Sequence, residues 1–212
     1  MAKSKNKFFV VWDGKEPGIY ASWEDCKKQI HGYGNAKYKG FETEAAAKEA
    51  LLSPYWDFIG KKGKEKKPDA ELIAKYGMPD FESLAVDAAC SGNPGAMEYQ
   101  GVYTRSGEVV FKQGPFPEGT NNIGEFLALV HGLALLKQKG LSMPLYTDSK
   151  TALAWLKKKK TKTELERTPR NEYLFELIAR AEKWLAENEY TTEVLKWHTE
   201  AWGEIPADFG RK

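Results

Sequence analysis

Three acidic residues lie within or beside apolar segments, and they are the residues best suited to chemistry. Asp87 sits inside an apolar run at 84–89, Asp148 ends a second run, and Glu125 falls in the first turn of an otherwise apolar predicted helix. An ionised carboxylate in a buried strand costs free energy unless a cation or hydrogen bonds compensate for it. Converging carboxylates would also raise one another's pKa, unless a divalent metal ion keeps them ionised.

Carboxylate oxygens without accompanying Cys or His side chains indicate Mg²⁺ or Mn²⁺ as the metal. Two such ions about 4 Å apart can activate a water molecule and stabilise the leaving oxygen of a phosphodiester. Each acid also has a plainer interpretation. A strand-end Asp is commonly a cap or turn residue, and a Glu in the first turn of a helix complements the helix dipole. Taken singly, each acid favours that plainer interpretation.

The elements that would position these acids form an α/β pattern from about residue 82 onwards. Apolar periodicity distinguishes its strands from its helices, and Ser106-Gly107 is a typical hairpin turn. Strands are expected over 83–89, 99–105, 108–114, 143–147 and 192–197. Helices are expected over 121–138, over 149–158 with Ser149 as the cap, and over 171–187. This order predicts a mixed sheet with helices packed on it.

A smaller β-β-α-β-α unit precedes this pattern. Its strands are expected at 7–12 and 36–41, and its helices begin after the caps Ser22 and Thr43. The first of these helices is expected to end at Gly32 and Gly34. The composition then shifts to a Lys-rich run, with a possible short helix at 69–76. We therefore expect domains at 1–52 and 81–212, joined by a flexible linker at 53–80.

The composition sets broad limits on the class of protein. The 212 residues carry a net charge of +2, which is too small to indicate nucleic-acid binding by itself. Apolar runs all fall short of the ~20 residues that span a bilayer, and the N-terminus does not resemble an export signal. Cys26 and Cys90 are far apart, which favours reduced thiols over a zinc site or a disulfide framework. A cytoplasmic location without a membrane partner is expected.

Longer motifs surround the acids and favour a metal site over the plainer interpretation of each acid. They are VDAACSGNPG at 86–95, GTNNIGEFLA at 119–128, YTDS at 146–149, and WHT at 197–199 followed by GEIPAD at 203–208. This ordered set resembles the motifs of type 1 ribonuclease H and covers most of 82–212. The loop Trp202-Gly203-Glu204 and the ending Gly210-Arg211-Lys212 are most similar to the Bacillus halodurans-like bacterial enzymes. The resemblance implies a ribonuclease H-like mixed five-stranded sheet flanked by helices.

The resemblance also implies roles for individual residues. The four metal-binding carboxylates of the family match Asp87, Glu125, Asp148 and Asp208, which implies two Mg²⁺ ions per site, with Mn²⁺ as a substitute. Glu204 matches an additional acid in a loop near the site. His198 matches a mobile histidine that assists product release in other members, although the Bacillus halodurans-like enzymes carry Gln there. A partly buried histidine at a strand end is the alternative.

The resemblance further implies contacts with both strands of a substrate duplex. Ribonucleotides offer 2′-hydroxyls in the minor groove, and the turn at 91–93 would approach them. Trp155 matches an aromatic residue that packs on a deoxyribose, although a core Trp of an amphipathic helix is the plainer interpretation. Thr120, Asn122 and Thr163 match a pocket for one DNA phosphate. Glu164, which follows Thr163, stands where the related enzyme carries Thr. The predicted set is Ser91, Gly92, Asn93, Thr120, Asn121, Asn122, Trp155 and Thr163.

Segments of the smaller unit carry a second resemblance. FVVW at 9–12, GIY at 18–20, WEDC at 23–26 and KYKGF at 37–41 resemble the hybrid-binding domain found in front of eukaryotic and some bacterial type 1 ribonucleases H. By this resemblance, the rings of Trp23 and Tyr38 face the DNA strand. Lys37 and Lys39 correspond to phosphate contacts. Gly40 stands where others carry a second Lys, which would reduce affinity and salt sensitivity. Core packing is expected for Trp12 and Phe41.

Together these patterns predict a monomeric endonuclease that hydrolyses the RNA strand of RNA/DNA hybrids. The expected products carry 3′-hydroxyl and 5′-phosphate ends, and no protein partner is indicated. Two other classes stay open. The same core occurs in transposases and junction resolvases that act on DNA, and fold does not fix function. A non-catalytic hybrid-binding protein is the second, and the four acids argue against it.

Overall fold

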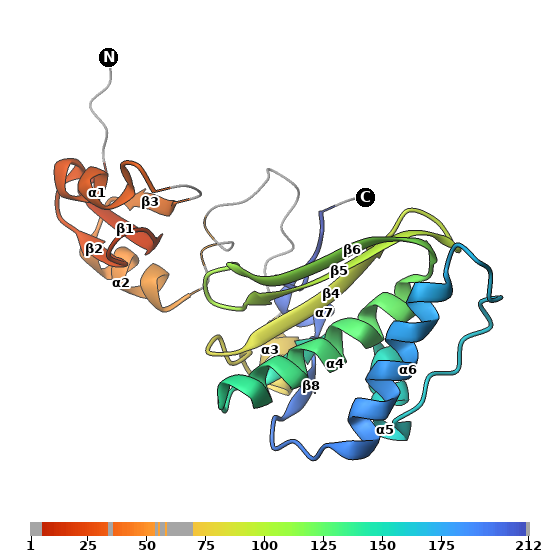
Figure 1. Ribbon diagram of the computed structural model, residues 1–212. Coiled ribbons are helices and arrows are strands. Elements are labelled where there is room, and N and C mark those ends of the chain that lie inside the picture. Colours follow the sequence, from red (N-terminus) through yellow and green to blue (C-terminus); the bar gives the residue numbers. More distant parts are fainter. Residues whose placement is uncertain (1–5, 34–35, 54, 56–57, 59–69, 211–212) are drawn as a thin grey trace. The chain divides into compact units, whose positions relative to one another are not determined.

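The computed structural model describes residues 6–33, 36–53, 55, 58 and 70–210 of the chain (Figure 1). These belong to two compact units, Met1–Glu65 and Lys66–Lys212. Gly34, the Lys-rich run of the expected linker and the last two residues of the expected bacterial-type ending lie outside the described residues. Within the described part of the chain, no helix has both the length and the apolar character needed to cross a membrane.

The first unit is a three-stranded antiparallel sheet with two helices. The strands β1 (Phe8–Asp13), β2 (Gly18–Tyr20) and β3 (Lys37–Phe41) lie in the order β2-β1-β3. Helices α1 (Trp23–Ile30) and α2 (Glu44–Leu52) begin after Ser22 and Thr43, whose side chains accept hydrogen bonds from the N–H groups of Asp25 and Ala46. The predicted element order and both predicted caps are therefore confirmed.

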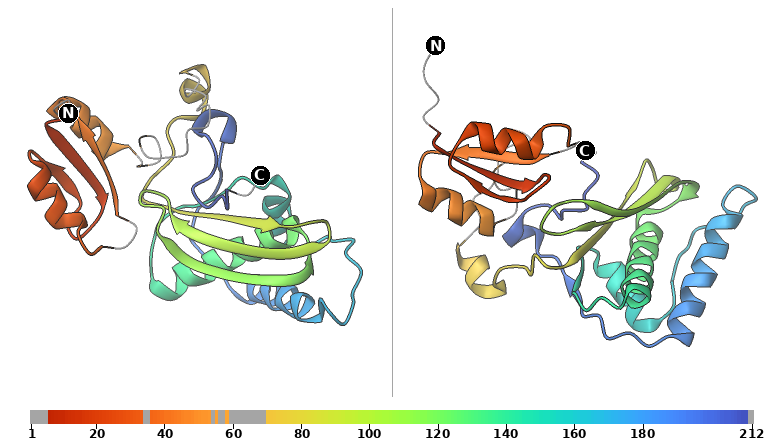
Figure 2. Two further views of the ribbon diagram at one scale, coloured as in Figure 1. Left: turned by 90° about the horizontal axis from the view of Figure 1, so that it is seen from above. Right: turned by 60° about the vertical axis from the view of Figure 1, so that its left-hand side comes forward.

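The core of this unit follows from the alternation of β1. Val10 and Trp12 point to one face, where they pack with Ala47 and Ala50 of α2. The indole N–H of Trp12 donates to the carbonyls of Ala50, at 2.9 Å, and Ser53, at 3.0 Å. Figure 2 shows α1 on the opposite side of this sheet from α2. The expected core role of Trp12 is confirmed.

The second unit is built on a five-stranded mixed sheet of strand order β6-β5-β4-β7-β8. Strands β4, β5 and β6 are antiparallel neighbours, whereas β7 and β8 run parallel to β4. This confirms the expected ribonuclease H-like mixed sheet flanked by helices. In chain order the elements are α3 (Ala70–Tyr76), β4 (Leu84–Cys90), β5 (Gly95–Tyr103), β6 (Val109–Gly119), α4 (Asn121–Lys139), β7 (Leu145–Thr147), α5 (Lys150–Lys158), α6 (Glu172–Glu187), β8 (Val194–Lys196) and α7 (Thr199–Trp202).

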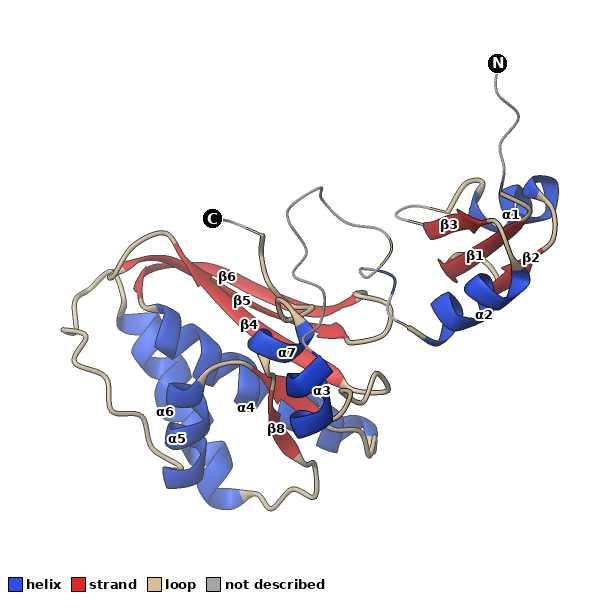
Figure 3. Ribbon diagram, turned by 180° about the vertical axis from the view of Figure 1, so that it is seen from behind, coloured by secondary structure: helices blue, strands red, loops and turns tan. Residues whose placement is uncertain are grey.

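Both faces of the larger sheet are covered. Helix α4 packs on β4 and β5, and α5 and α6 pack on α4, which encloses the main core (Figure 1). A second cluster on the other face joins Ala85 and Val102 of the sheet to the C-terminal segment through Trp197, Ile205 and Ala207. Helices α3 and α7 lie next to each other on this side of the sheet, as seen from behind in Figure 3. The C-terminal segment is therefore held against the sheet rather than within it.

Strands β5 and β6 are longer than the sequence pattern predicts. β5 begins at Gly95 instead of residue 99, and β6 continues to Gly119 instead of residue 114. The added part of β6 contains Pro115 and Pro117, which can be accommodated because β6 is an edge strand. Irregularities in its pairing with β5 shift the register at several points along the strand.

Candidate metal centre and substrate surface

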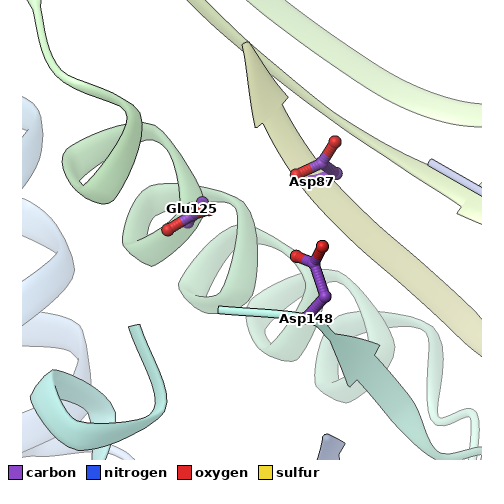
Figure 4. Close-up of side chains that lie close together, drawn as sticks. All are labelled: Asp87, Glu125 and Asp148. Atoms are coloured by element: carbon purple, nitrogen blue, oxygen red, sulfur yellow. The ribbon is translucent and has the colours of Figure 1, made fainter. Parts of the chain in front are cut away.

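Three of the predicted acids meet at one end of the larger sheet. Ligand atoms of Asp87, Glu125 and Asp148 all lie within 4.8 Å of one another. Figure 4 shows the three side chains approaching from β4, from α4 and from the end of β7. Leu84 and Ala85 pair in parallel with Leu145 and Tyr146, so continuing this register by two residues brings Asp148 level with Asp87. The parallel pairing therefore accounts for the meeting of the two aspartates.

Close packing of α4 on the sheet brings Glu125 to them. A Cβ at Gly124 would lie 2.7 Å from the Cβ of Ala88 and from the sulfur of Met97, so only glycine allows this approach. The Glu125 carboxylate accepts hydrogen bonds from the Asn121 amide, at 2.9 Å, and from the Ser149 hydroxyl. These contacts orient Glu125, and Ser149 also caps α5 through the N–H of Ala152.

The electrostatics of the cluster indicate a cation requirement. Burial, reinforced by the charge of Asp148, raises the pKa of Asp87 to about 8. Burial raises the pKa of Glu125 to about 7, although hydrogen bonds from Ser149 and Asn121 oppose the rise. The pKa of Asp148 is also raised by burial, and the Lys196 ammonium opposes that increase. Keeping these carboxylates ionised therefore costs free energy, and a bound cation would offset that cost.

The donor set fits a hard divalent cation. Among the described residues, the group contains carboxylates alone, without His or Cys, which favours Mg²⁺ or Mn²⁺ over zinc. Asp208, the fourth predicted ligand, lies outside this group. It is close enough for its charge to raise the pKa of both Asp87 and Asp148. One of its carboxylate oxygens accepts a hydrogen bond from the N–H of Gly210 at 2.8 Å.

The two remaining predicted catalytic residues flank α7. Glu204 is exposed, and it lies close enough to the cluster for its charge to raise the pKa of Asp148. His198 is the N-cap residue of α7 and is partly buried, stacked on Tyr76 and edge-on to Trp202. Its surroundings match the plainer interpretation of a packed histidine at a strand end.

The predicted RNA-facing turn is closed by its own hydrogen bonds. The Ser91 hydroxyl accepts from the N–H of Ala96 at 3.0 Å, and the Ser91 N–H donates to the Ala96 carbonyl at 3.0 Å. A Cβ at Gly95 would lie 2.4 Å from the nitrogen of Gly92, so the turn requires glycine there. Ser91, Gly92 and Asn93 are all exposed and accessible to a ligand.

Five predicted substrate residues line one pocket of about 560 Å³, namely Asn93, Thr120, Asn122, Trp155 and Thr163. Lys162 adds positive charge, whereas Glu118, Glu164 and Glu166 add negative charge. Glu118 is held by Arg170 at 3.1 Å and accepts a hydrogen bond from the Thr168 hydroxyl at 2.6 Å. Trp155 is only 7% exposed and packs edge-on against Phe126, so most of its surface belongs to the core. Asn121 lies outside this lining and contacts Glu125.

The first unit carries a pair of exposed aromatic rings. Trp23 is 40% exposed and Tyr38 is 39% exposed, with ring centroids 5.7 Å apart. Lys37 and Lys39 lie on the same strand as Tyr38. Lys37 sits over the ring of Tyr55 at 5.3 Å, and Lys39 donates to the carbonyl of Phe58 at 2.5 Å.

Several contributors to the site went unnoticed in the sequence. The positive charge of Lys196 opposes the rise in the pKa of Asp148 and of Glu125. Ser149 was expected only as a helix cap, and Gln100 was not singled out, although its amide donates to the Ala207 carbonyl at 2.7 Å. The position of Lys196 directly before the WHT motif was a weak signal. Neither the second role of Ser149 nor that of Gln100 had a sequence signal, because both depend on contacts between distant segments.

Comparisons with known proteins cover both units. Residues 81–208, more than half of the chain, match the family model described as RNase H, and residues 7–51 match the model described as Ribonuclease H1 N-terminal domain. The Ribonuclease H of Saccharomyces cerevisiae is 35% identical over 99 residues, which are 43% of this chain and 28% of that protein. The Ribonuclease H of Schizosaccharomyces pombe is 24% identical over 98% of this chain and 97% of that protein. The crystal structure of RNase H1 from Halobacterium salinarum is 22% identical, covers 54% of this chain and 83% of that chain, and has a TM-score of 0.35.

Proposed function

The chain belongs to the ribonuclease H family, and we propose that it is an endonuclease that hydrolyses the RNA strand of RNA/DNA hybrids. The observation that carries the proposal is the convergence of Asp87, Glu125 and Asp148 within 4.8 Å. Family membership explains why these acids would be kept together despite their mutual repulsion. The proposed reaction breaks the bond between phosphorus and the 3′ oxygen by attack of water, leaving 3′-hydroxyl and 5′-phosphate ends.

We assign the cation site to Asp87, Glu125, Asp148 and Asp208, and Mg²⁺ as its natural occupant, with Mn²⁺ as a substitute. Two bound ions would supply an activated water and charge stabilisation at the leaving oxygen. Asn121 and Ser149 keep the Glu125 carboxylate oriented for this task. Glu204 adds negative charge at the edge of the site, and we assign His198 a role in product release.

The proposed substrate surface begins beside these acids. The exposed turn at Ser91, Gly92 and Asn93 is suited to the 2′-hydroxyls of the RNA strand, because backbone groups there can approach closely. The pocket lined by Thr120, Asn122 and Thr163 is proposed to take one phosphate of the DNA strand. Thr120 is the N-cap residue of α4, and helix N-termini favour anions. Trp155 would offer the edge of its ring to a neighbouring deoxyribose.

We propose that the first unit binds the hybrid and increases its residence on the enzyme. Its Trp23–Tyr38 pair offers two exposed rings, and the cations Lys37 and Lys39 flank Tyr38 along β3. Stacking and cation contacts of this kind tolerate any base sequence. Domain limits of 1–52 and 81–212 belong to the same proposal, with α3 of the segment between them packed on α7 of the second unit. A Bacillus halodurans-like type of catalytic domain, a monomeric state and a cytoplasmic location also belong to it. Cys26 and Cys90, both without a disulfide, support the last point.

The test is cleavage of one end-labelled sequence prepared as RNA/DNA, RNA/RNA and DNA/DNA duplexes, with Mg²⁺ and with chelator. The proposal expects cutting of the RNA strand in the hybrid alone, and none with chelator. Cutting of the DNA duplex would instead indicate a transposase-like or resolvase-like activity. Binding of the hybrid without any cutting would indicate a non-catalytic binding protein. Either of these results would overturn the proposal.

A further inference from the structure

A row of three residues crosses the larger sheet at the level of the acidic cluster. Asp87 on β4 is paired with Gln100 on β5, and Gln100 is paired with Lys112 on β6. Directly paired residues of an antiparallel sheet have their side chains on the same face. The row therefore starts at the central carboxylate of the cluster and extends over two neighbouring strands to the edge.

Gln100 and Lys112 both contact the C-terminal segment. The Gln100 amide donates to the carbonyl of Ala207 at 2.7 Å, in a buried hydrogen bond between residues 107 positions apart. The Lys112 ammonium lies 5.0 Å from the ring centroid of Phe209 and forms an ion pair with the buried Glu98 at 2.8 Å. These contacts fall on the residues immediately before and after Asp208. The segment is thus attached to the sheet on both sides of the fourth acid.

Asp208 needs such attachments more than the other three acids do. Asp87 lies in a central strand, Asp148 follows one directly, and Glu125 lies in a long helix. Asp208 instead follows the four-residue helix α7 and a turn closed by its own N–H donating to the Ile205 carbonyl at 2.8 Å. No strand or long helix fixes its distance from Asp87. Contacts from the sheet must supply that constraint.

We propose that Gln100 and Lys112 are positioning residues that hold Asp208 at the edge of the cation site. The cross-strand row that contains them begins at Asp87, so the sheet links the two acids. A buried amide is costly without a partner, so the Gln100 side chain selects one position of the Ala207 carbonyl. Lys112 is fixed in turn by Glu98. The inference rests on the proposed function, because it gives the attachments a purpose in cation binding.

The experiment measures Mg²⁺ binding to the full-length, metal-free protein by titration calorimetry, with no nucleic acid present. Gln100→Met keeps the length of the side chain but removes the donor. Gln113→Met is the matched control, because Gln113 lies exposed on β6 of the same sheet. Asp208→Ala and the double variant Gln100→Met/Asp208→Ala complete a thermodynamic cycle, which isolates the coupling between the two residues. Hydrogen exchange at the amides of Asp208 and Gly210 gives an independent readout.

We expect Gln100→Met to weaken Mg²⁺ binding on the order of tenfold, as loss of a residue that orients a ligand commonly does. Gln113→Met should match the unmodified protein. In the Asp208→Ala background, Gln100→Met should have no further effect, because a residue that acts through Asp208 has nothing left to position. Amide exchange at 208 and 210 should become faster in Gln100→Met. Lys112→Met should produce the same effects from the other side of Asp208.

The contrary outcomes are separable. If the unmodified protein binds Mg²⁺ and Gln100→Met binds it equally well, the positioning role is wrong while the proposed function stands. Equal effects of Gln100→Met with and without Asp208 would show that the glutamine acts on the fold in general. If the unmodified protein does not bind Mg²⁺, the metal centre itself is refuted. Should Gln100→Met fail to fold, Gln100→Asn, which keeps the amide but shortens its reach, takes its place in the cycle.

Discussion

Tyr76 stacks on His198, with ring centroids 3.8 Å apart and planes inclined by 13°. The contact joins α3 to the N-cap residue of α7. The indole N–H of Trp202 adds a second connection by donating to the Gly77 carbonyl at 2.9 Å. Residues 70–77 were expected in a flexible linker, yet they pack on the segment that leads to Glu204 and Asp208.

Replacing Tyr76 by Ala should release α3 from the larger unit. Aromatic pairs contribute about 0.5–1.5 kcal/mol beyond simple burial, so the free energy of unfolding should fall by roughly 1 kcal/mol. Hydrogen exchange at residues 70–77 should become faster. Tyr76→Phe keeps the ring and should behave like the unmodified protein. Unchanged exchange in Tyr76→Ala would mean that the stack does not hold α3 in place.

Asp148→Asn should nearly abolish cleavage while leaving hybrid binding intact. The change keeps the shape of the side chain but removes a charge that a cation needs. The rate should fall by about 10²–10³-fold, the order expected when an electrostatic element of an active site is lost. Single-turnover cleavage and fluorescence anisotropy with a labelled hybrid measure the two properties separately. Glu108→Gln, on an exposed turn, is the control, and a normal rate in Asp148→Asn would contradict the metal-site assignment.

The metal-free protein should lose stability as the pH rises. Unfolded Asp and Glu titrate near about 4, whereas the pKa of Asp87 in the folded chain is about 8 and that of Glu125 about 7. Folding therefore favours the protonated carboxyls, and this stabilisation is complete below about pH 4 and lost as the pH passes through the folded pKa values.

Thermal unfolding in chelator should accordingly show a lower Tm at pH 9 than at pH 6. Asp87→Asn should reduce that difference, and Mg²⁺ should restore the Tm at high pH by binding the ionised cluster. A Tm in chelator that is equally high at pH 9, with and without Asp87, would show that the cluster carries no electrostatic cost.

Gly124→Ala should separate Glu125 from Asp87. The added methyl group would meet Ala88 and Met97 at 2.7 Å, and overpacking of this kind costs about 1–3 kcal/mol. Gly132→Ala is the matched control on the same helix, where the nearest atoms are flexible Leu145 methyl groups at 3.0 and 3.2 Å. Cleavage should therefore fall much more in Gly124→Ala. Equal cleavage by the two variants would argue against close helix packing as the determinant of the site.

Trp23→Ala should weaken binding of a long hybrid. Stacking of a base or sugar on an aromatic ring contributes about 1–3 kcal/mol, so KM should rise on the order of tenfold while kcat stays unchanged. Tyr33→Ala is the control, because Tyr33 is equally exposed, at 40%, but is not part of the Trp23–Tyr38 pair. If both variants keep the original KM, the role of the first unit in hybrid binding is wrong.

The sequence by itself was sufficient for the elements whose signals are local. Apolar periodicity and the caps Ser22, Thr43 and Ser149 predicted the helices, because a side-chain oxygen that bonds an N–H three residues later needs no distant partner. The strand limits were less accurate for β6, which continues through Pro115 and Pro117 beyond the predicted end at residue 114. Their tolerance depends on β6 being at the sheet edge, which is a property of the sheet.

The sequence also pointed to the three acids that meet in the structure, Asp87, Glu125 and Asp148, since each lies in a motif that can be recognised along the chain. Only the tertiary structure decided how they are held. The parallel register of β4 and β7 sets Asp87 beside Asp148, and the glycine contact of α4 brings in Glu125. Ser149, Gln100 and Tyr76 gained their roles from partners at least 24 residues away. Contacts over such separations follow from the packing of whole elements, so no local pattern encodes them.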